Sequence, residues 1–174
     1  MSSLEDAARR VQRGDVSAFR IIVEATAAKL VRLGARIMGS VTEAEDVVQE
    51  AYIKAHKALV EGRFDERSRV ETWLHRIVVN AALDARRKRK RDASEPLDDA
   101  AIGERGSTAE EVVALRELAA WLDELPDDQR TALLLKSVEG MSSAEVAEVL
   151  GCSEGAVEQR LVRARATLRE RSTS

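Results

Sequence analysis

The sequence is poor in aromatic residues, prolines and cysteines, and these shortages restrict both the fold and the chemistry. Its 174 residues include two tryptophans, two phenylalanines, one tyrosine and two prolines, which favours uninterrupted helices and gives no reason to expect a sheet. The single cysteine, Cys152, excludes an intrachain disulfide and suits a reducing compartment. We interpret Cys152 as an ordinary small turn residue in preference to a redox switch.

Several signatures of other protein classes are also missing. No apolar run approaches the length of a membrane span, and the first residues do not resemble a secretion signal. There is no glycine-rich phosphate loop, nucleophile elbow or H-E-x-x-H motif, and His56 and His75 lie on separate predicted helices without metal-ligand spacing. We expect His75 on the outer side of its helix. We therefore expect a soluble, cytoplasmic protein that is not an enzyme, with no catalytic residue, metal, cofactor, small-molecule substrate or membrane contact of its own.

Charge is distributed unevenly along the chain. Residues 1–91 contain 19 Lys and Arg against 13 Asp and Glu, a net charge of +6, whereas residues 92–174 contain 9 against 18, a net charge of −9. The two sums return the formal net charge of −3. A basic first half suits a polyanionic partner, while the acidic second half concentrates its arginines near its end.

Residues 141–171 predict a helix-turn-helix. Ser142 and Glu145 form a capping box, Gly151 ends the first short helix, and Ser153 is placed to cap the second. One face of the first helix is apolar, and the second helix has apolar residues at i, i+4, i+7 and i+11, so the two helices can pack together. The polar residues left outside are Gln159, Arg160 and Arg163 on one flank and Glu158, Arg165 and Arg169 on the other. A polar, arginine-rich second helix favours major-groove binding over a merely solvated hairpin.

A helix is expected between Thr42 and Gly62, and it has an acidic exposed stripe. Thr42 is its predicted N-cap, with Glu45 as the capping partner. Its buried stripe runs from Ala44 to Leu59 and leaves a second set of residues outside: Asp46, Gln49, Glu50 and Ile53. An exposed isoleucine among acids suits a docking face for a basic partner helix, and a solvated surface explains the pattern equally well.

Residues 63–91 contain a second candidate nucleic-acid surface. A helix expected from about Ser68 has a predicted buried stripe of Val70, Leu74, Ile77, Ala81 and Ala85. Trp73, Arg76, Asn80 and Arg87 line one flank, and the helix ends in an unbroken basic run, residues 86–91. Aromatic, amide and guanidinium groups suit unstacked bases and phosphates. The alternative assigns Trp73 to the core and the basic run to helix-end electrostatics; the position of Phe64 and Trp73 beside this surface favours nucleic acid.

The remaining segments complete a prediction of an all-α protein with two small helical domains. Residues 4–38 read as two helices that meet near Gly14. Residues 92–110 are acidic and aperiodic and contain Pro96, Gly103 and Gly106, which predicts a flexible linker. Helices are expected from Glu110 to Leu125 and from Asp127 towards Gly140, with Trp121 in the core and Ala132, Leu133 and Leu135 facing inward. The domains are then residues 1–91 and 111–174.

Three runs in this order resemble a bacterial sigma-70 family sigma factor of the extracytoplasmic-function (ECF, group IV) subgroup. They are residues 42–59 (TEAEDVVQEAYIKAHKAL), residues 64–87 (FDERSRVETWLHRIVVNAALDARR) and residues 122–169, which end in the helix-turn-helix. Such proteins keep only the second and fourth sigma domains. The resemblance implies that residues 1–91 bind core RNA polymerase and melt the −10 element, and that residues 111–174 read the −35 element.

The resemblance also implies roles for individual residues. Asp46, Gln49, Glu50 and Ile53 match the family's docking site for the β′ clamp helices. The positions that match the family's −10 surface are Val60, Phe64, Arg76, Ile77, Asn80, Arg86, Arg87 and Lys88, and we add Trp73 from the flank described above. Among these, Val60, Phe64, Ile77 and Asn80 match the pocket that holds a flipped base. The −35 positions are Ser153, Glu158, Gln159, Arg160, Arg163 and Arg165.

Further partners are implied in the same way. The helices that precede the helix-turn-helix would bind the β flap, the acidic linker would thread towards the active centre and the RNA exit channel, and an anti-sigma factor would occlude both domains. The loop of residues 64–69 differs from the Phe-Gly pattern of many family members, so −10 base choice does not transfer. Glu158 is an acid where a basic or small polar residue is common, so it can accept from a cytosine amine or pair with a nearby arginine.

Two other classes of protein fit parts of this pattern. A free-standing helix-turn-helix regulator would use its first half for dimerisation or effector binding and would read paired half-sites. A small helical enzyme with a DNA-binding tail would need turnover on nucleic acid or nucleotide. The ordered trio of motifs favours the sigma factor over both.

Overall fold

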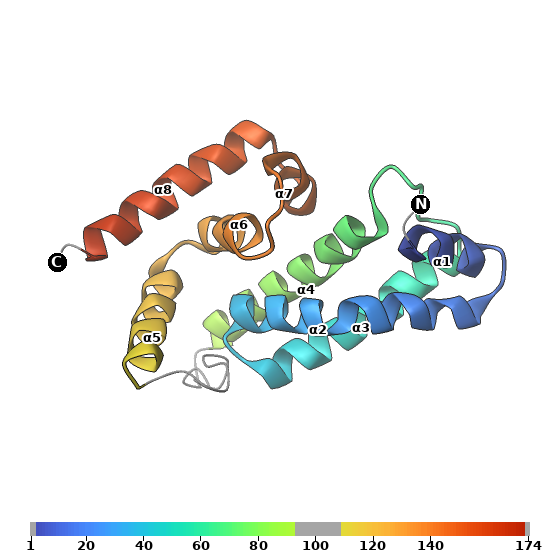
Figure 1. The fold of residues 1–174 in the computed structure, drawn as a ribbon, viewed down its shortest axis with the longest axis horizontal. Helices are drawn as coiled ribbons and strands as arrows, with labels where there is room; N and C mark the ends of the chain where they lie inside the picture. Colours follow the sequence, from blue (N-terminus) through green and yellow to red (C-terminus); the bar gives the residue numbers. More distant parts are fainter. Residues whose placement is uncertain (1–2, 93–108, 173–174) are drawn as a thin grey trace. The chain divides into compact units, whose positions relative to one another are not determined.

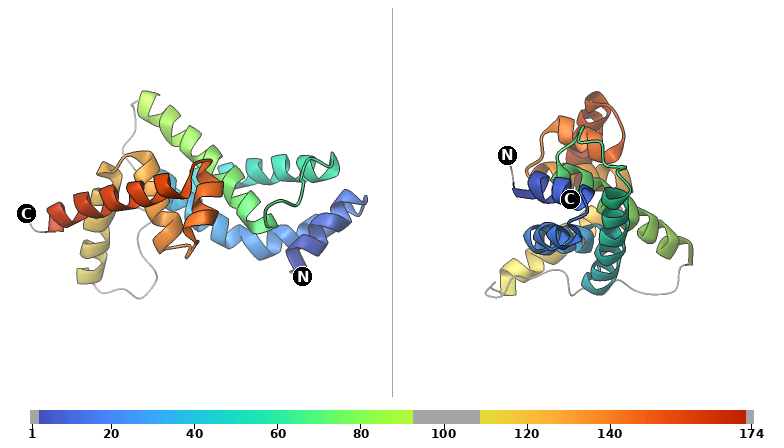
Figure 2. Two further views of the ribbon diagram at one scale, coloured as in Figure 1. Left: turned by 90° about the horizontal axis from the view of Figure 1, so that it is seen from above. Right: turned by 90° about the vertical axis from the view of Figure 1, so that its right-hand side faces the viewer.

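The computed structural model describes residues 3–92 and 109–172, and every regular element in these residues is a helix (Figures 1 and 2). The chain divides into two units, Met1–Ala93 and Ser94–Ser174. The prediction of an all-α fold with two helical domains is confirmed. Most of the predicted linker lies outside the described residues. No described helix combines the length and the apolar character that crossing a membrane requires.

The first unit is a helical bundle built on three long helices. These are α2 (Phe19–Met38), α3 (Val41–Val60) and α4 (Val70–Asp92), which all pack against one another. The short helix α1 (Ser3–Gln12) packs against all three at one end of the bundle, and the 3₁₀ turn η1 (Val16–Ala18) connects it to α2 (Figure 1). The buried core draws on every one of the four helices; its largest fully buried members include Val11, Ile22, Leu30, Leu59 and Leu74.

Helices α2 and α3 approach closely where a side chain is missing. A Cβ atom added to Gly34 would lie 3.2 Å from the Cβ of Ala44, so glycine and alanine allow the two backbones to meet. The predicted N-cap of α3 is wrong by two positions. Ser40, not Thr42, precedes the helix, and its hydroxyl accepts a hydrogen bond from the backbone N–H of Glu43 at 3.3 Å.

The buried face of α4 is wider than the predicted stripe and is rotated from it. Val70 and Leu74 are buried as expected, but Ile77, Ala81 and Ala85 are only half-buried. The face also includes residues that the stripe omitted: Thr72, His75, Val78, Val79, Ala82, Leu83 and Arg86. The physical reason is that α4 packs against both α2 and α3, so one apolar stripe does not describe its contacts.

His75 is therefore a core residue, and its predicted position on the outer side of the helix is wrong. Its ring is 1% exposed, and Nδ1 lies 2.7 Å from the backbone carbonyl oxygen of Glu71, one turn earlier. This local partner, on the same helix, satisfies one ring nitrogen of the buried side chain.

The second unit contains α5 (Ala109–Glu124), α6 (Asp127–Ser137), α7 (Ser143–Leu150) and α8 (Glu154–Ser172). Helix α8 packs against the other three. Leu134 and Leu135 of α6 are buried, whereas Leu133, predicted to face inward, is half-buried, as is Trp121. The buried Arg130 forms an ion pair with Asp123, which joins the start of α6 to the end of α5.

Candidate nucleic-acid interface

Helix α3 presents the predicted acidic strip to solvent. Asp46, Gln49 and Glu50 are exposed, and the side chain of Ile53 is 64% exposed. These positions follow i, i+3, i+4 and i+7 spacing, which places them on one face, while Ala44, Val48, Ala51 and Ala55 turn into the core. The sequence correctly placed all four strip residues outside. A large exposed apolar side chain that follows two carboxylates on one helical face gives this face both shape and charge for a partner.

An apolar groove that was not predicted from the sequence adjoins this strip. Gln49 and Ile53 line it together with half-buried residues of α2 and α3; they include Phe19, Val23, Val31, Tyr52 and His56. The Phe19 ring meets the rings of Tyr52 and His56 edge to face, at centroid distances of 6.0 and 5.0 Å. Burial raises the pKa of the Tyr52 hydroxyl, which is hydrogen-bonded to Thr26. The groove extends the candidate docking face beyond α3 onto α2.

A second surface lies along α4. Arg76, Asn80, Arg87 and Lys88 are exposed on this helix, and Trp73 and Ile77 are half-buried beside them. Val60, at the end of α3, is 51% exposed. The surface therefore offers partly covered apolar groups next to an amide and to cationic groups. Such a combination suits unstacked bases and the phosphates that connect them.

Phe64 occupies a different position from the other predicted −10 residues. It is 5% exposed, and its ring packs against Trp73 with a centroid distance of 4.7 Å and an angle of 43°. Phe64 thus supports Trp73 from below and presents almost no surface of its own.

Because α4 is helical, some residues of the basic run at its end bond α2 and the others face solvent. Arg86 is 3% exposed and donates a hydrogen bond from Nη1 to the carbonyl oxygen of Ile37 at 3.2 Å. Arg89 forms an ion pair with Glu43 at 2.8 Å and donates to the carbonyl oxygen of Met38. Both arginines thereby bond the last carbonyl groups of α2. The placement of Arg86 at a DNA surface is therefore wrong, and the residues that remain outside are Arg87, Lys88, Lys90 and Arg91.

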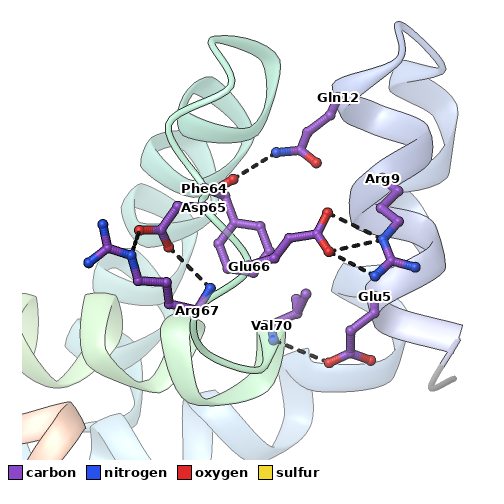
Figure 3. A network of polar contacts seen from close by, with 8 residues as sticks. All are labelled: Glu5, Arg9, Gln12, Phe64, Asp65, Glu66, Arg67 and Val70. Carbon is purple, nitrogen blue, oxygen red and sulfur yellow. Dashed lines mark hydrogen bonds and ion pairs between the residues drawn. The ribbon is translucent and has the colours of Figure 1, made fainter.

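The loop between α3 and α4 is fastened to α1 at three points (Figure 3). Arg9 binds both carboxylate oxygens of Glu66, the shortest contact being Nη2 to Oε2 at 2.7 Å. Gln12 donates to the carbonyl oxygen of Phe64 at 2.9 Å, and Glu5 accepts from the backbone N–H of Val70 at 3.3 Å. The hydrogen bond from Arg9 lowers the pKa of the Glu66 carboxyl, so this group stays ionised at neutral pH.

The helix-turn-helix forms as the sequence predicted. Ser142 and Glu145 make both hydrogen bonds of a capping box, and Gly151 ends α7 in the left-handed region with φ of 63°. The hydroxyl of Ser153 accepts from the backbone N–H of Ala156 at 3.2 Å and so caps the start of α8. Buried side chains of α7 and α8 join the two helices; they are Val146, Ala147, Val149, Val157, Leu161 and Ala164.

The outer face of α8 carries most of the predicted −35 residues. Ser153, Gln159, Arg163 and Arg165 are exposed. Val162, which the sequence analysis missed, is 64% exposed on the same helix. Its position off the buried stripe of Val157, Leu161 and Ala164 was the available signal. An exposed aliphatic group among polar ones is suited to contact a thymine methyl group.

Two −35 candidates have partners within the protein. Arg160 is half-buried, forms an ion pair with Asp128 of α6 at 3.0 Å, and donates from Nη1 to the sulfur of Cys152 at 3.0 Å. Glu158 accepts a hydrogen bond from the hydroxyl of Ser143, at the start of α7. Both contacts tie α8 to the preceding helices, so these two side chains fix the position of the helix that presents the others.

Comparison with known families matches the two units to two parts of one family. A family model described as Sigma-70 region 2 matches residues 22–92, and one described as Sigma-70, region 4 matches residues 115–168. Together they span the described part of both units except residues 3–21 and the two ends of the second unit.

Whole-chain relatives agree with these matches. The RNA polymerase sigma-H factor of Pseudomonas aeruginosa is 40% identical over 170 residues, which cover 90% of this chain and 86% of the relative. The ECF RNA polymerase sigma factor SigW of Bacillus subtilis is 34% identical over 177 residues, which cover 93% of this chain and 92% of the relative.

Solved structures show the same fold. CnrH, solved in complex with the cytosolic domain of CnrY, has a TM-score of 0.74 at 28% identity, covering 97% of this chain and 96% of CnrH. The sigma factor RpoE of Bartonella quintana, solved with the anti-sigma factor NepR, has a TM-score of 0.69 at 26% identity, covering 87% of this chain and 94% of RpoE. The chain belongs to the sigma-70 family of RNA polymerase sigma factors, in the ECF group, whose members are transcription initiation factors and not enzymes.

Proposed function

We propose that this sigma factor docks on the β′ clamp helices of core RNA polymerase through the strip on α3, Asp46, Gln49, Glu50 and Ile53. The exposure of all four residues on one helical face supports this assignment. Carboxylates can pair with basic residues of the clamp helices, and Ile53 supplies an apolar anchor whose burial adds affinity. The neighbouring groove gives the partner a further apolar surface.

We assign recognition of the melted −10 element to the first unit, within residues 1–91. Trp73, Ile77 and Val60 form the apolar part of the surface, and Asn80 can bond a base edge. Arg76, Arg87 and Lys88 lie outside on the same helix and can neutralise phosphates. Phe64 contributes from beneath, because it holds the ring of Trp73 in place. Capture of a flipped base by this surface offsets the cost of unstacking it.

Recognition of the −35 element is assigned to α8 in the second unit, within residues 111–174. Gln159 and Arg163 are placed to reach base edges, and Val162 to contact a thymine methyl group. Arg165 and Ser153 are positioned for phosphates. Arg160 and Glu158 act indirectly in this proposal, since each holds α8 against α6 or α7. The other helices of the second unit are the candidates for binding the β flap.

Regulation by an anti-sigma factor is part of the same proposal. CnrH was solved with CnrY, and the RpoE of Bartonella quintana with an anti-sigma factor. An anti-sigma factor can hold the two units in an arrangement that prevents them from binding core polymerase. Because the proposed function acts on chromosomal promoters, we also assign the protein to the cytoplasm. Purification of the protein from its native cells should yield a stoichiometric partner other than polymerase; isolation only as free protein or with polymerase would contradict this part.

The observation that carries the proposal is the joint presence, on two helical units, of a docking strip and two nucleic-acid surfaces. The test is transcription by purified core RNA polymerase on a pool of random promoters, with and without the protein, followed by sequencing of the transcript starts. New starts that share two upstream elements at fixed spacing support the proposal. Binding to DNA alone, as a dimer and without initiation, would instead favour a free-standing regulator.

A further inference from the structure

We propose that α1 is a positioning element for the −10 surface and acts by holding the loop of residues 63–69 in one conformation. The inference rests on the proposed function of that surface. Helix α1 lies outside the residues that the region 2 family model matches, which begin at residue 22. It nevertheless has three side chains in contact with this region: two reach the loop itself, and the third reaches Val70, the residue directly after it (Figure 3).

The three contacting side chains share one face of α1. Glu5, Arg9 and Gln12 are spaced at i, i+4 and i+7, so they stand above one another along the helix. Gln12 bonds the backbone at the start of the loop, Arg9 bonds Glu66 in the middle, and Glu5 bonds the first backbone N–H of α4. A rigid helix therefore fixes both ends and the centre of the loop at once.

The loop adopts a backbone conformation that its sequence does not favour. Glu66 has φ of 57°, and it is the only residue other than glycine with a positive φ in the described part of the chain. A side chain with a Cβ atom is unfavourable in this region, and such conformations persist when surrounding contacts hold them. Arg9 provides such a contact, since it binds both oxygens of the Glu66 carboxylate.

The conformation of the loop sets the position of the aromatic pair beneath the −10 surface. Phe64 belongs to the loop, is held by Gln12 through its carbonyl oxygen, and packs on Trp73. A change in the path of the loop would move the Phe64 ring and remove the support of Trp73. Arg9 and Glu66 thus act on the DNA through the loop and the aromatic pair, as positioning residues.

The experiment compares Arg9→Ala, Glu66→Gln and the charge-exchanged double variant Arg9→Glu/Glu66→Arg in the full chain. The matched control is Arg10→Ala, because Arg10 is the next residue of α1 and pairs with Asp15, away from the loop, at 2.8 Å. For each protein, open-complex formation with core polymerase is measured on a promoter from the random pool and on its single-base −10 variants. Core affinity and thermal midpoint are measured in parallel.

We expect Arg9→Ala and Glu66→Gln to reduce discrimination among the −10 variants by about three- to fivefold, the loss typical of one solvent-accessible ion pair. The double variant should recover most of the lost −10 discrimination, and Arg10→Ala should discriminate among the −10 variants as the wild type does. Core affinity should be equal in all proteins. A purely structural role would lower the thermal midpoint without changing the −10 preference.

Wild-type −10 preference in both Arg9→Ala and Glu66→Gln would overturn the inference and leave the proposed function standing. Absence of any −10 preference in the wild-type protein would overturn the proposed function, and the inference with it. A Glu66→Gly variant adds a separate readout, since glycine relieves the left-handed backbone while removing the carboxylate. Because glycine adopts this conformation without Arg9, we expect Glu66→Gly to keep more −10 discrimination than Glu66→Gln; less discrimination than Glu66→Gln would contradict a role of the ion pair in holding this backbone.

Discussion

Arg86 and Arg87 are adjacent in the basic run, but the turn of α4 gives them different surroundings. Arg86 is 3% exposed and bonds the end of α2, whereas Arg87 is exposed and pairs with Asp84 at 3.4 Å. Their substitutions should therefore have different effects, even though both remove a guanidinium group from one helix.

We expect Arg86→Ala to lower the free energy of unfolding by about 1–3 kcal/mol, because carbonyl groups at the end of α2 lose a buried donor. Arg87→Ala should leave stability almost unchanged and weaken open complexes. Denaturant unfolding followed by circular dichroism tests the first expectation, and open-complex lifetime at two salt concentrations tests the second. Equal stability of the two variants would contradict the burial of Arg86.

The Glu66 carboxyl gives a second prediction at the scale of one residue. The hydrogen bond from Arg9 lowers its folded-state pKa, so the contact contributes stability above the pKa of the unfolded chain. That contribution disappears as the pH falls through the lowered folded-state pKa, in the acid range. NMR titration should therefore give a Glu66 midpoint that rises towards the usual glutamate value in Arg9→Ala and does not move in Arg10→Ala.

At the scale of single helices, α3 can be tested by reversing its charge. We expect Asp46→Lys/Glu50→Lys to reduce capture of core RNA polymerase by at least about tenfold, because two attractive contacts become repulsive. Glu24→Lys is the matched control: Glu24 is an exposed acid on α2 and lies outside the strip. A pull-down with purified core polymerase measures the difference. Equal capture of both proteins would argue against the strip as the docking site.

Helix α8 gives a comparable test within one element. Arg163→Ala should weaken binding of a −35 duplex in the holoenzyme by about tenfold and relax preference at one base pair. Arg160→Ala should weaken all −35 duplexes alike, because it releases α8 from Asp128 of α6. Competition binding with single-base −35 variants separates the two patterns. Loss of preference at one position in Arg160→Ala would make Arg160 a direct base contact.

Which features the sequence predicted depends on how local their causes are. The capping box of Ser142, the stop at Gly151 and the cap at Ser153 each act within a few residues, so the helix-turn-helix was predictable. The exposure of the α3 strip also followed from helical period alone. In contrast, Arg86 and His75 turned inward because α4 contacts two helices, and no single periodic stripe encodes that.

The α1 contacts illustrate the same limit over a longer distance. Arg9 and Glu66 are separated by 57 positions, and Gln12 bonds a backbone oxygen that any residue could supply. Neither contact leaves a sequence pattern. The groove beside Ile53 was missed for a related reason, because the sequence places Phe19 and Val23 on an apolar face without showing how fully it is covered.

For the whole molecule, the division into two units predicts separable activities. We expect a fragment of residues 1–92 to bind core RNA polymerase, and a fragment of residues 109–174 to bind neither the β′ clamp helices nor melted −10 DNA. Two thermal transitions, each reproduced by one fragment, would support independent folding. A fragment 1–92 that is folded but fails to bind core polymerase would show that docking needs both units.

Arg89 has a mechanical consequence for the first unit. It joins α4 to Glu43, in the first turn of the helix proposed to dock, and to the carbonyl group of Met38, the last residue of α2. Arg89 thus links α3, the helix proposed to dock on polymerase, to α4, the helix proposed to bind the melted DNA, at one end of the bundle. Under the proposed function, force that the DNA exerts on α4 would therefore reach α3, the helix proposed to hold the polymerase, through the contacts of Arg89.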